Sequence, residues 1–228
     1  MSLILGIETS TKMCSVAINK DSKLLAFREQ GGNYSHAELL AIFIKEVCDD
    51  AKISLQDIDY VAVGRGPGSY TGLRIGTSAA KGICYAIEKP LISIDTLKIM
   101  TFKVIESGFY QDYLFCPMID ARRMEVFTSV YNSKLEEIIP ISAKIIDENS
   151  FSELLKSEKI LFFGDGADKC KSVLKKHTNA IFIDNIEPSS IQLNLLANKM
   201  LNNNPLFEDV AYYEPFYLKD FITTSGNK

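Results

Sequence analysis

The sequence predicts an α/β protein of two lobes, each built on a mixed β-sheet flanked by helices. Strand-like apolar segments alternate with helix-like segments along the 228 residues, a pattern typical of sheets covered by helices. An apolar strand that ends in an acidic residue, a polar turn and a second strand occur twice, at residues 3–18 and again at 114–131. We therefore predict a duplicated architecture, with a first lobe at residues 1–110 and a smaller second lobe at residues 111–228.

The first lobe is predicted to open with a three-stranded meander, because apolar segments alternate with polar turns. Ser35, followed three residues later by Glu38, has the spacing of a capping box and predicts the start of a helix. The expected strands are 3–7, 14–18, 24–27, 60–63 and 91–94. The expected helices are 36–52, 73–87 and a third that begins at Asp95 or Thr96 and runs to about residue 106.

The second lobe is predicted to have the same pattern of strands and helices, with shorter elements. The expected strands are 114–119, 125–131, 160–163 and 180–184. The expected helices are 149–156, 167–176 and 190–202.

Composition and charge limit the classes of function. The chain has 25 Lys and Arg against 29 Asp and Glu, for a net charge of −4, which gives no global attraction to nucleic acids or anionic membranes. Any contact with RNA is therefore expected to be local or supplied by a partner. The five cysteines form no Cys-x-x-Cys pair and indicate reduced thiols. No stretch approaches about 20 apolar residues, so we expect a cytoplasmic protein without a membrane segment.

The glycine-rich segment Gly64–Gly76 is the most informative local feature. Its first part, residues 64–72, holds four glycines and a proline, which predicts tight turns. A polar loop that leads into a helix can cradle an anion, but the spacing matches neither common phosphate-binding glycine motif. The other interpretation is a rigid turn in which Ser69 or Thr71 caps the next helix.

The helices on either side of this loop carry more apolar and small residues than a one-sided surface helix needs. Glycines inside the second helix cost about 1 kcal/mol each relative to alanine, so something must require close approach. A partner-binding surface and a two-sided core position both explain the pattern. The residues predicted for the partner surface are His36, Leu39, Leu40, Phe43, Ile44, Val47, Gly72, Arg74, Gly76, Ala79, Ala80, Ile83 and Cys84.

Catalytic motifs are scarce. The two histidines, His36 and His177, are in no zinc-binding pattern, so we expect no metal site and disfavour a metallopeptidase. The acidic turns 8–11 and 120–123 occupy the places where a duplicated ATPase would bind phosphate. An active ATPase or small-molecule kinase is therefore the alternative hypothesis. The residues of this residual nucleotide pocket are Glu8, Thr9, Ser10, Asp120, Gly164 and Gly166. We predict no cofactor and no catalytic residue.

Several segments together resemble the TsaB (YeaZ) family of tRNA threonylcarbamoyladenosine biosynthesis proteins. The long segment Gly64–Gly76 is the most specific of them. The segments are residues 4–11, Ser35–His36, 64–76, 119–123 and 164–166.

The resemblance implies a two-lobed fold of the actin-like ATPase superfamily (RNase H-like) in a member without catalytic activity. It implies that the chain binds the homologous transferase TsaD, which transfers threonylcarbamoyl to N6 of adenosine 37 in tRNAs reading ANN codons. It further implies the ATPase TsaE as a member of the larger complex, homodimers formed through the same first-lobe helices, and only indirect contact with tRNA.

Overall fold

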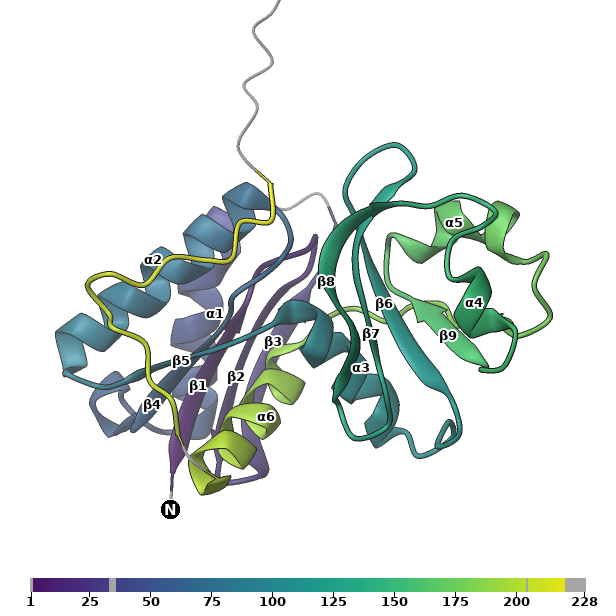
Figure 1. The fold of residues 1–228 in the computed structure, drawn as a ribbon. Helices are drawn as coiled ribbons and strands as arrows, with labels where there is room; N and C mark the ends of the chain where they lie inside the picture. Colours follow the sequence, from purple (N-terminus) through teal and green to yellow (C-terminus); the bar gives the residue numbers. More distant parts are fainter. Residues whose placement is uncertain (1, 33–35, 204, 220–228) are drawn as a thin grey trace, which may run out of the picture.

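Two five-stranded sheets form the centres of two lobes in the computed structural model of this chain (Figure 1). The structure describes residues 2–32, 36–203 and 205–219. Ser35, the predicted helix cap, lies outside these residues.

The first sheet has the strand order β3-β2-β1-β4-β5. Its first three strands form an antiparallel meander, and β4 and β5 extend the sheet in parallel from β1. Antiparallel neighbours need only short turns, whereas each parallel neighbour needs a crossover, which α1 and α2 supply. The strands are β1 (Leu3–Glu8), β2 (Cys14–Lys20), β3 (Lys23–Gln30), β4 (Tyr60–Gly64) and β5 (Leu91–Ile94).

The second sheet has the order β10-β9-β6-β7-β8, the order of the first sheet read from the other edge. Its first three strands also form an antiparallel meander, and β9 and β10 also join in parallel. The predicted fold of two mixed sheets flanked by helices is confirmed. The strands are β6 (Leu114–Asp120), β7 (Glu125–Tyr131), β8 (Glu137–Ile145), β9 (Ile160–Phe163) and β10 (Ala180–Phe182).

Helices cover the sheets in layers (Figure 1). Helices α1 and α2 cover one face of the first sheet, and α6 covers the opposite face. Helix α3 contacts both lobes. Its Ile99 and Phe102 pack against the first sheet on the face that α6 covers. Its Leu97, Met100 and Val104 pack against the second sheet. The helices are α1 (His36–Ala51), η1 (Leu55–Asp57), α2 (Tyr70–Ile87), α3 (Thr96–Glu106), α4 (Ser152–Leu155), α5 (Ala167–Leu174) and α6 (Ser190–Asn203).

The end of the described chain returns to the first lobe, contrary to the predicted assignment of residues 111–228 to the second lobe. The side-chain amide of Asn194 on α6, fully buried, donates to the carbonyl oxygens of Ile4 and Ala17 and to Oδ1 of Asn19. The chain then passes the edge of the sheet, where the backbone N–H of Glu208 donates to the carbonyl of Leu91 of β5 at 2.9 Å, and residues 211–219 run across α2. The backbone N–H of Phe216 donates to the carbonyl of Arg65 at 2.8 Å. The second lobe therefore consists of the second sheet with α4 and α5.

One strand was not predicted. The edge strand β8 contains Pro140, which argues against a strand except at a sheet edge, and all of its residues are exposed or half-buried. Its apolar residues do alternate, at Ile139, Ile141, Ala143 and Ile145, and this was the available sequence signal. Helix α2 starts three residues before the predicted residue 73, because Ser69 is its cap.

Candidate functional site

The loop between β4 and α2 is fixed by hydrogen bonds within the chain. The backbone N–H of Ser69 donates to the carbonyl of Ser10 at 2.6 Å, and that of Arg65 donates to the carbonyl of Ile94 at 2.9 Å. The side chain of Ser69 accepts from the N–H of Gly72 at 3.2 Å and so caps α2. The rigid-turn interpretation with Ser69 as the cap is confirmed. The amides of Ser69 and Gly72 already have acceptors, which disfavours an anion cradle there.

The glycines of the first turns of α2 allow the turn between β1 and β2 to pack closely on the helix. The hydroxyl of Thr9 donates to the carbonyl of Gly72 at 2.8 Å. A Cβ atom on Gly72 would lie 2.1 Å from the carbonyl oxygen of Thr9, and one on Gly76 would lie 2.2 Å from the Thr9 hydroxyl. These two glycines therefore serve a contact inside the chain.

Glu8, at the end of β1, is fully buried. Its Oε1 accepts from the backbone N–H of Ser10 at 2.7 Å, and the hydroxyl of Thr96 lies 3.5 Å from its Oε2. Burial raises the pKa of Glu8, and the hydrogen bonds from Ser10, Thr9 and Thr96 offset only part of the rise. The carboxyl group therefore belongs to the interior of the first lobe.

Replacing Glu8 with glutamine should make the chain more stable at neutral pH. The pKa of Glu8 is higher in the folded state than its ordinary value of 4.5. The stability that the protonated carboxyl group contributes is therefore complete below pH 4.5 and is lost as the pH rises through the folded-state pKa. Urea unfolding at pH 5 and pH 8 should show the advantage of Glu8→Gln growing with pH. Glu158→Gln, at an exposed site, should show no such trend, and equal trends in the two variants would contradict the assignment.

A cleft of about 1030 Å³ separates the lobes. Of the predicted nucleotide-pocket residues, Ser10 and Asp120 line it, whereas Glu8 and Thr9 are buried in the first lobe. Gly164 and Gly166 pack on β6, because a Cβ on either would lie within 2.8 Å of the backbone of Met118 or Ile119. The structure thus does not bring the six candidates together.

Asp120 is already engaged at the rim of this cleft. Its carboxylate pairs with the ammonium of Lys169 and accepts from the backbone N–H of Arg122 at 2.8 Å. Partial burial alone would raise the pKa of Asp120, but these contacts and the nearby Lys12 lower it. No observation therefore favours the alternative of an ATPase or kinase that depends on Glu8 and Asp120.

Two acidic residues of the cleft, Glu125 and Asp165, were not among the predicted pocket residues. Asp165 lines the cleft and forms no ion pair with another described residue, while its Oδ1 accepts from the backbone N–H of Asp120 at 2.9 Å. Burial raises the pKa of Asp165, and the charge of Asp120 adds to the rise. A carboxylate between two glycines of a short turn gave no sequence signal beyond the turn itself.

The two histidines lie in different lobes and each contacts a backbone carbonyl. His36 Nε2 is 3.3 Å from the carbonyl oxygen of Met13, and His177 Nε2 is 3.1 Å from that of Glu148. Within residues 2–32, 36–203 and 205–219, no cluster of three or more His, Cys, Asp or Glu side chains has an arrangement that could hold a metal ion.

Most residues predicted for the partner surface are instead part of the first lobe's core. The surplus of apolar residues on α1 and α2 is explained by burial against the sheet and between the two helices. The buried residues are Leu40, Phe43, Ile44, Val47, Gly72, Gly76, Ala80 and Cys84. His36, Leu39, Ala79 and Ile83 are half-buried and Arg74 is exposed. Because Ala80 is 0% exposed, an arginine there would disrupt the fold itself.

The outer face of α2 has a solvent-exposed strip, which is formed by Thr71, Ser78, Gly82 and Tyr85. We call it the α2 strip. A Cβ on Gly82 would meet no atom within 4 Å, so no contact inside the described chain explains a glycine there. Tyr85 is 84% exposed. The glycine in mid-helix was the available sequence signal for this strip, but it was not among the predicted interface residues.

The C-terminal segment covers one flank of the α2 strip. The ammonium of Lys81 donates to the carbonyls of Ala211 and Tyr213, at 3.2 and 2.9 Å. Arg74 lies over the ring of Tyr70 and donates to the hydroxyl of Tyr217 at 3.3 Å. The strip is therefore bordered by residues 211–217 on one side, with α1 packed against α2 in the same layer. Ala41 and Ile42 are exposed on α1.

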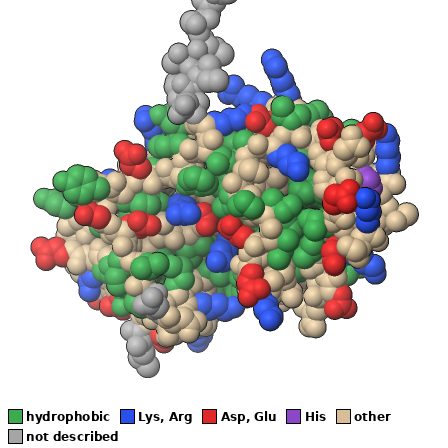
Figure 2. Space-filling model, viewed as in Figure 1, with side chains coloured by type: hydrophobic (Ala, Val, Ile, Leu, Met, Phe, Trp, Pro, Cys, Tyr) green, Lys and Arg blue, Asp and Glu red, His purple; other side chains and the backbone are tan. Residues whose placement is uncertain are grey.

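On the surface shown in Figure 2, positively and negatively charged side chains are interspersed and form no large patch of one sign. Hydrophobic side chains form patches between them over both lobes. Among the described residues, no helix combines the length and the apolar character that crossing a bilayer requires.

Comparisons with known proteins agree on one family. Residues 31–225 match the model of the family described as TsaD, tRNA N6-adenosine threonylcarbamoyltransferase. The chain is 30% identical over 173 residues to the tRNA threonylcarbamoyladenosine biosynthesis protein TsaB of Buchnera aphidicola subsp. Schizaphis graminum, covering 74% of this chain and 81% of that protein. It is 27% identical over 177 residues to TsaB of Bacillus subtilis, covering 75% of each.

The fold is similar to that of solved structures. A protein from Pseudomonas aeruginosa described as similar to peptidase YeaZ superposes with a TM-score of 0.83 at 22% identity, over 96% of this chain and 100% of that one. A glucomannokinase from Arthrobacter shares the fold alone, with a TM-score of 0.51 at 9% identity over 90% of this chain and 100% of that one. The fold is thus the two-lobed fold of the actin-like ATPases. From the family match and the TsaB relatives, the chain belongs to the TsaB (YeaZ) family of tRNA threonylcarbamoyladenosine biosynthesis proteins.

Proposed function

We propose that this chain is a non-catalytic scaffold subunit of tRNA threonylcarbamoyladenosine biosynthesis. It binds a TsaD-type transferase through the α2 strip and the exposed residues of α1, and it is required for threonylcarbamoyl transfer to N6 of adenosine 37. The same strip serves a homodimer when the transferase is absent. A TsaE-type ATPase joins the larger complex, tRNA is contacted through the partners, and the complex acts in the cytoplasm.

The observation that carries this proposal is the exposed glycine in the middle of α2. Gly82 costs about 1 kcal/mol of helix stability relative to alanine, and nothing in the described chain lies near enough to require it. A partner helix that approaches the backbone at Gly82 would explain the absence of a side chain. The exposed ring of Tyr85, one turn further along α2, supplies the kind of aromatic anchor that is enriched at protein interfaces.

The proposed lack of catalysis is supported by the environment of Glu8. Its carboxyl group is held in the interior of the first lobe by the N–H of Ser10 and does not line the cleft. A catalytic carboxylate must come within hydrogen-bond reach of the reacting group.

Replacing Ser78 with arginine should weaken binding to the TsaD-type transferase by roughly 100-fold, since a long charged side chain in the middle of a packed helical interface leaves a buried unpaired charge. Isothermal titration calorimetry of the purified proteins would measure the loss, and sedimentation equilibrium would measure the homodimer. Ser172→Arg is the matched control, because Ser172 is an exposed serine on helix α5 of the second lobe.

The functional assay is tRNA modification reconstituted from purified components, with and without this chain. We expect modification to require the chain, to be lost with Ser78→Arg and to be retained with Ser172→Arg. Equal activity of the two variants would contradict the interface. Modification in the absence of the chain would contradict the scaffold role.

A further inference from the structure

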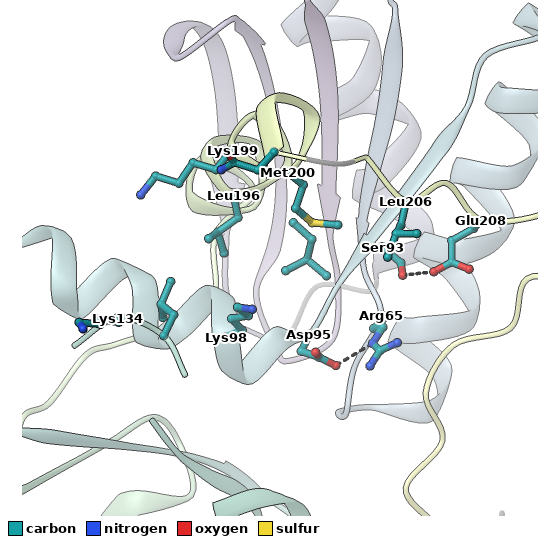
Figure 3. Close-up of a pocket in the computed structure, with 13 residues that line it drawn as sticks. Arg65, Ser93, Asp95, Lys98, Lys134, Leu196, Lys199, Met200, Leu206 and Glu208 are labelled. Carbon is teal, nitrogen blue, oxygen red and sulfur yellow. Dashed lines mark hydrogen bonds and ion pairs between the residues drawn. The ribbon is translucent and has the colours of Figure 1, made fainter. Parts of the chain in front are cut away.

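A second cavity, of about 560 Å³, lies on the side of the first sheet opposite to α1 and α2. Its walls come from α3, α6, the turn between β7 and β8 and residues 206–208 (Figure 3). It belongs neither to the α2 strip nor to the cleft between the lobes. Its volume is within the range of small-molecule sites, about 300–1000 Å³.

Three lysines from three separate elements surround this cavity. Lys98 is on α3, Lys134 is in the β7–β8 turn and Lys199 is on α6. In the part of the chain that the structure describes, none of the three ammonium groups lies within ion-pair distance of a carboxylate. The ammonium of Lys199 lies over the ring of Phe102, 4.1 Å from its centroid, a contact that stabilises the cation without neutralising its charge. Like charges gathered from distant parts of an acidic chain repel one another, and a bound anion would offset that repulsion.

Neither carboxylate of the cavity is ion-paired with one of these lysines. Asp95 pairs with Nε of Arg65 at 2.6 Å, and Glu208 accepts from the hydroxyl of Ser93. Figure 3 shows both interactions at one end of the cavity and the lysines toward the other. The cavity therefore has a cationic end and an end that offers hydrogen-bond acceptors.

Between the two ends the wall is apolar. Leu196 and Met200 of α6 lie there (Figure 3), and Leu206 borders the cavity while remaining 71% exposed. A flat ring can lie against such a wall. Asn203, also in the lining, has an amide that can both donate and accept hydrogen bonds.

We propose that this cavity binds one nucleotide unit. Its phosphate lies among Lys98, Lys134 and Lys199, its base lies against Met200 and Leu206, and its hydroxyl or amino groups donate to Asp95 and Glu208. Phosphate, an apolar ring face and hydrogen-bond donors occur together in nucleotides. The unit belongs either to a free nucleotide or to an RNA strand, and the chemistry of recognition is common to both. This site does not depend on the interface proposed above.

Binding of three probes to the full chain tests the proposal: ATP, a short fluorescein-labelled single-stranded RNA, and inorganic phosphate. The combined variant Lys98→Ala, Lys134→Ala and Lys199→Ala should raise the Kd for ATP or for the RNA about tenfold or more. The matched control removes the same charge at Lys156, Lys175 and Lys176, which are exposed lysines of the second lobe outside the cavity lining, and should change the Kd by less than about twofold. Circular dichroism would verify that both variants are folded.

The pattern of binding identifies the source and decides the outcome. If ATP binds and displaces the RNA, the two ligands share this site. If only ATP binds, the ligand is a free nucleotide, and if only the RNA binds, the ligand is an RNA strand. Leu206→Asp should weaken binding of ATP or RNA and leave phosphate binding unchanged. The proposal is overturned if neither ATP nor RNA binds, if the two triple variants lose equal affinity, or if Leu206→Asp has no effect.

Discussion

Gly72→Ala should destabilise the chain by about 3 kcal/mol, because the added methyl group would overlap the backbone of the turn between β1 and β2. Its Cβ would lie 2.1 Å from the carbonyl oxygen of Thr9, and a backbone atom of the turn that directly follows β1 cannot move away as a flexible side chain can. The hydrogen bond from the Thr9 hydroxyl to the Gly72 carbonyl, 2.8 Å long, would be displaced as well. Urea unfolding followed by circular dichroism would measure the change.

The same helix provides the control. Gly82→Ala introduces the same methyl group where it meets no atom within 4 Å, and it should stabilise the chain by about 1 kcal/mol through helix propensity. If the α2 strip receives a partner helix, this more stable variant should nevertheless bind the transferase more weakly. Two glycines ten residues apart on one helix would then have opposite effects on stability, and equal stability changes would contradict the packing described for Gly72.

Asn194→Asp should cost more than about 3 kcal/mol of stability at neutral pH. The amide nitrogen of Asn194 donates to three oxygens, the carbonyls of Ile4 and Ala17 and Oδ1 of Asn19. An aspartate would place an oxygen against these acceptors and bury an unpaired charge at a position that is 0% exposed. The lost stability should be recovered in part as the pH falls and the new carboxyl group becomes protonated.

Asn202→Asp on the same helix is the control for this prediction. Asn202 is exposed and donates only to the carbonyl of Asn198, one turn earlier, so we expect a change below about 1 kcal/mol. Denaturant unfolding at pH 5 and pH 8 would compare the variants. Equal losses in both would contradict the role assigned to the Asn194 amide in holding α6 to the sheet.

The layout of strands and helices could be predicted from local pattern. Local residue patterns predicted strand β4, from the buried run Tyr60–Gly64, and helix α2, from a segment rich in small residues. The repeated strand, turn and strand pointed to the duplication that the two sheets show. The edge strand β8 was not predicted, because Pro140 within the segment argues against a strand, although its apolar residues alternate from Ile139 to Ile145.

The candidate site was harder to predict, because the role of each residue depends on which residues it contacts in the folded chain. From sequence, Gly72, Gly76 and Gly82 are equivalent small residues of one helix. In the fold, the first two contact Thr9 and the third meets nothing. The lysines of the second cavity are also invisible in sequence, since Lys98 and Lys199 come together only when α6 packs beside α3.

The return of α6 to the first sheet also determines the order in which the chain can be completed during synthesis. The face of the first sheet that carries Ile4, Ala62 and Ile92 is covered by Leu193, Leu196 and Ala197, residues that the ribosome makes about 190 positions after β1. Domains that are contiguous in sequence can fold as they emerge, whereas this lobe has an incompletely covered apolar face until the whole second lobe and α6 have been translated. A ribosome that stalls within the second lobe therefore holds a nascent chain whose first sheet is covered on this face only by Ile99 and Phe102 of α3, a target for chaperones and for aggregation.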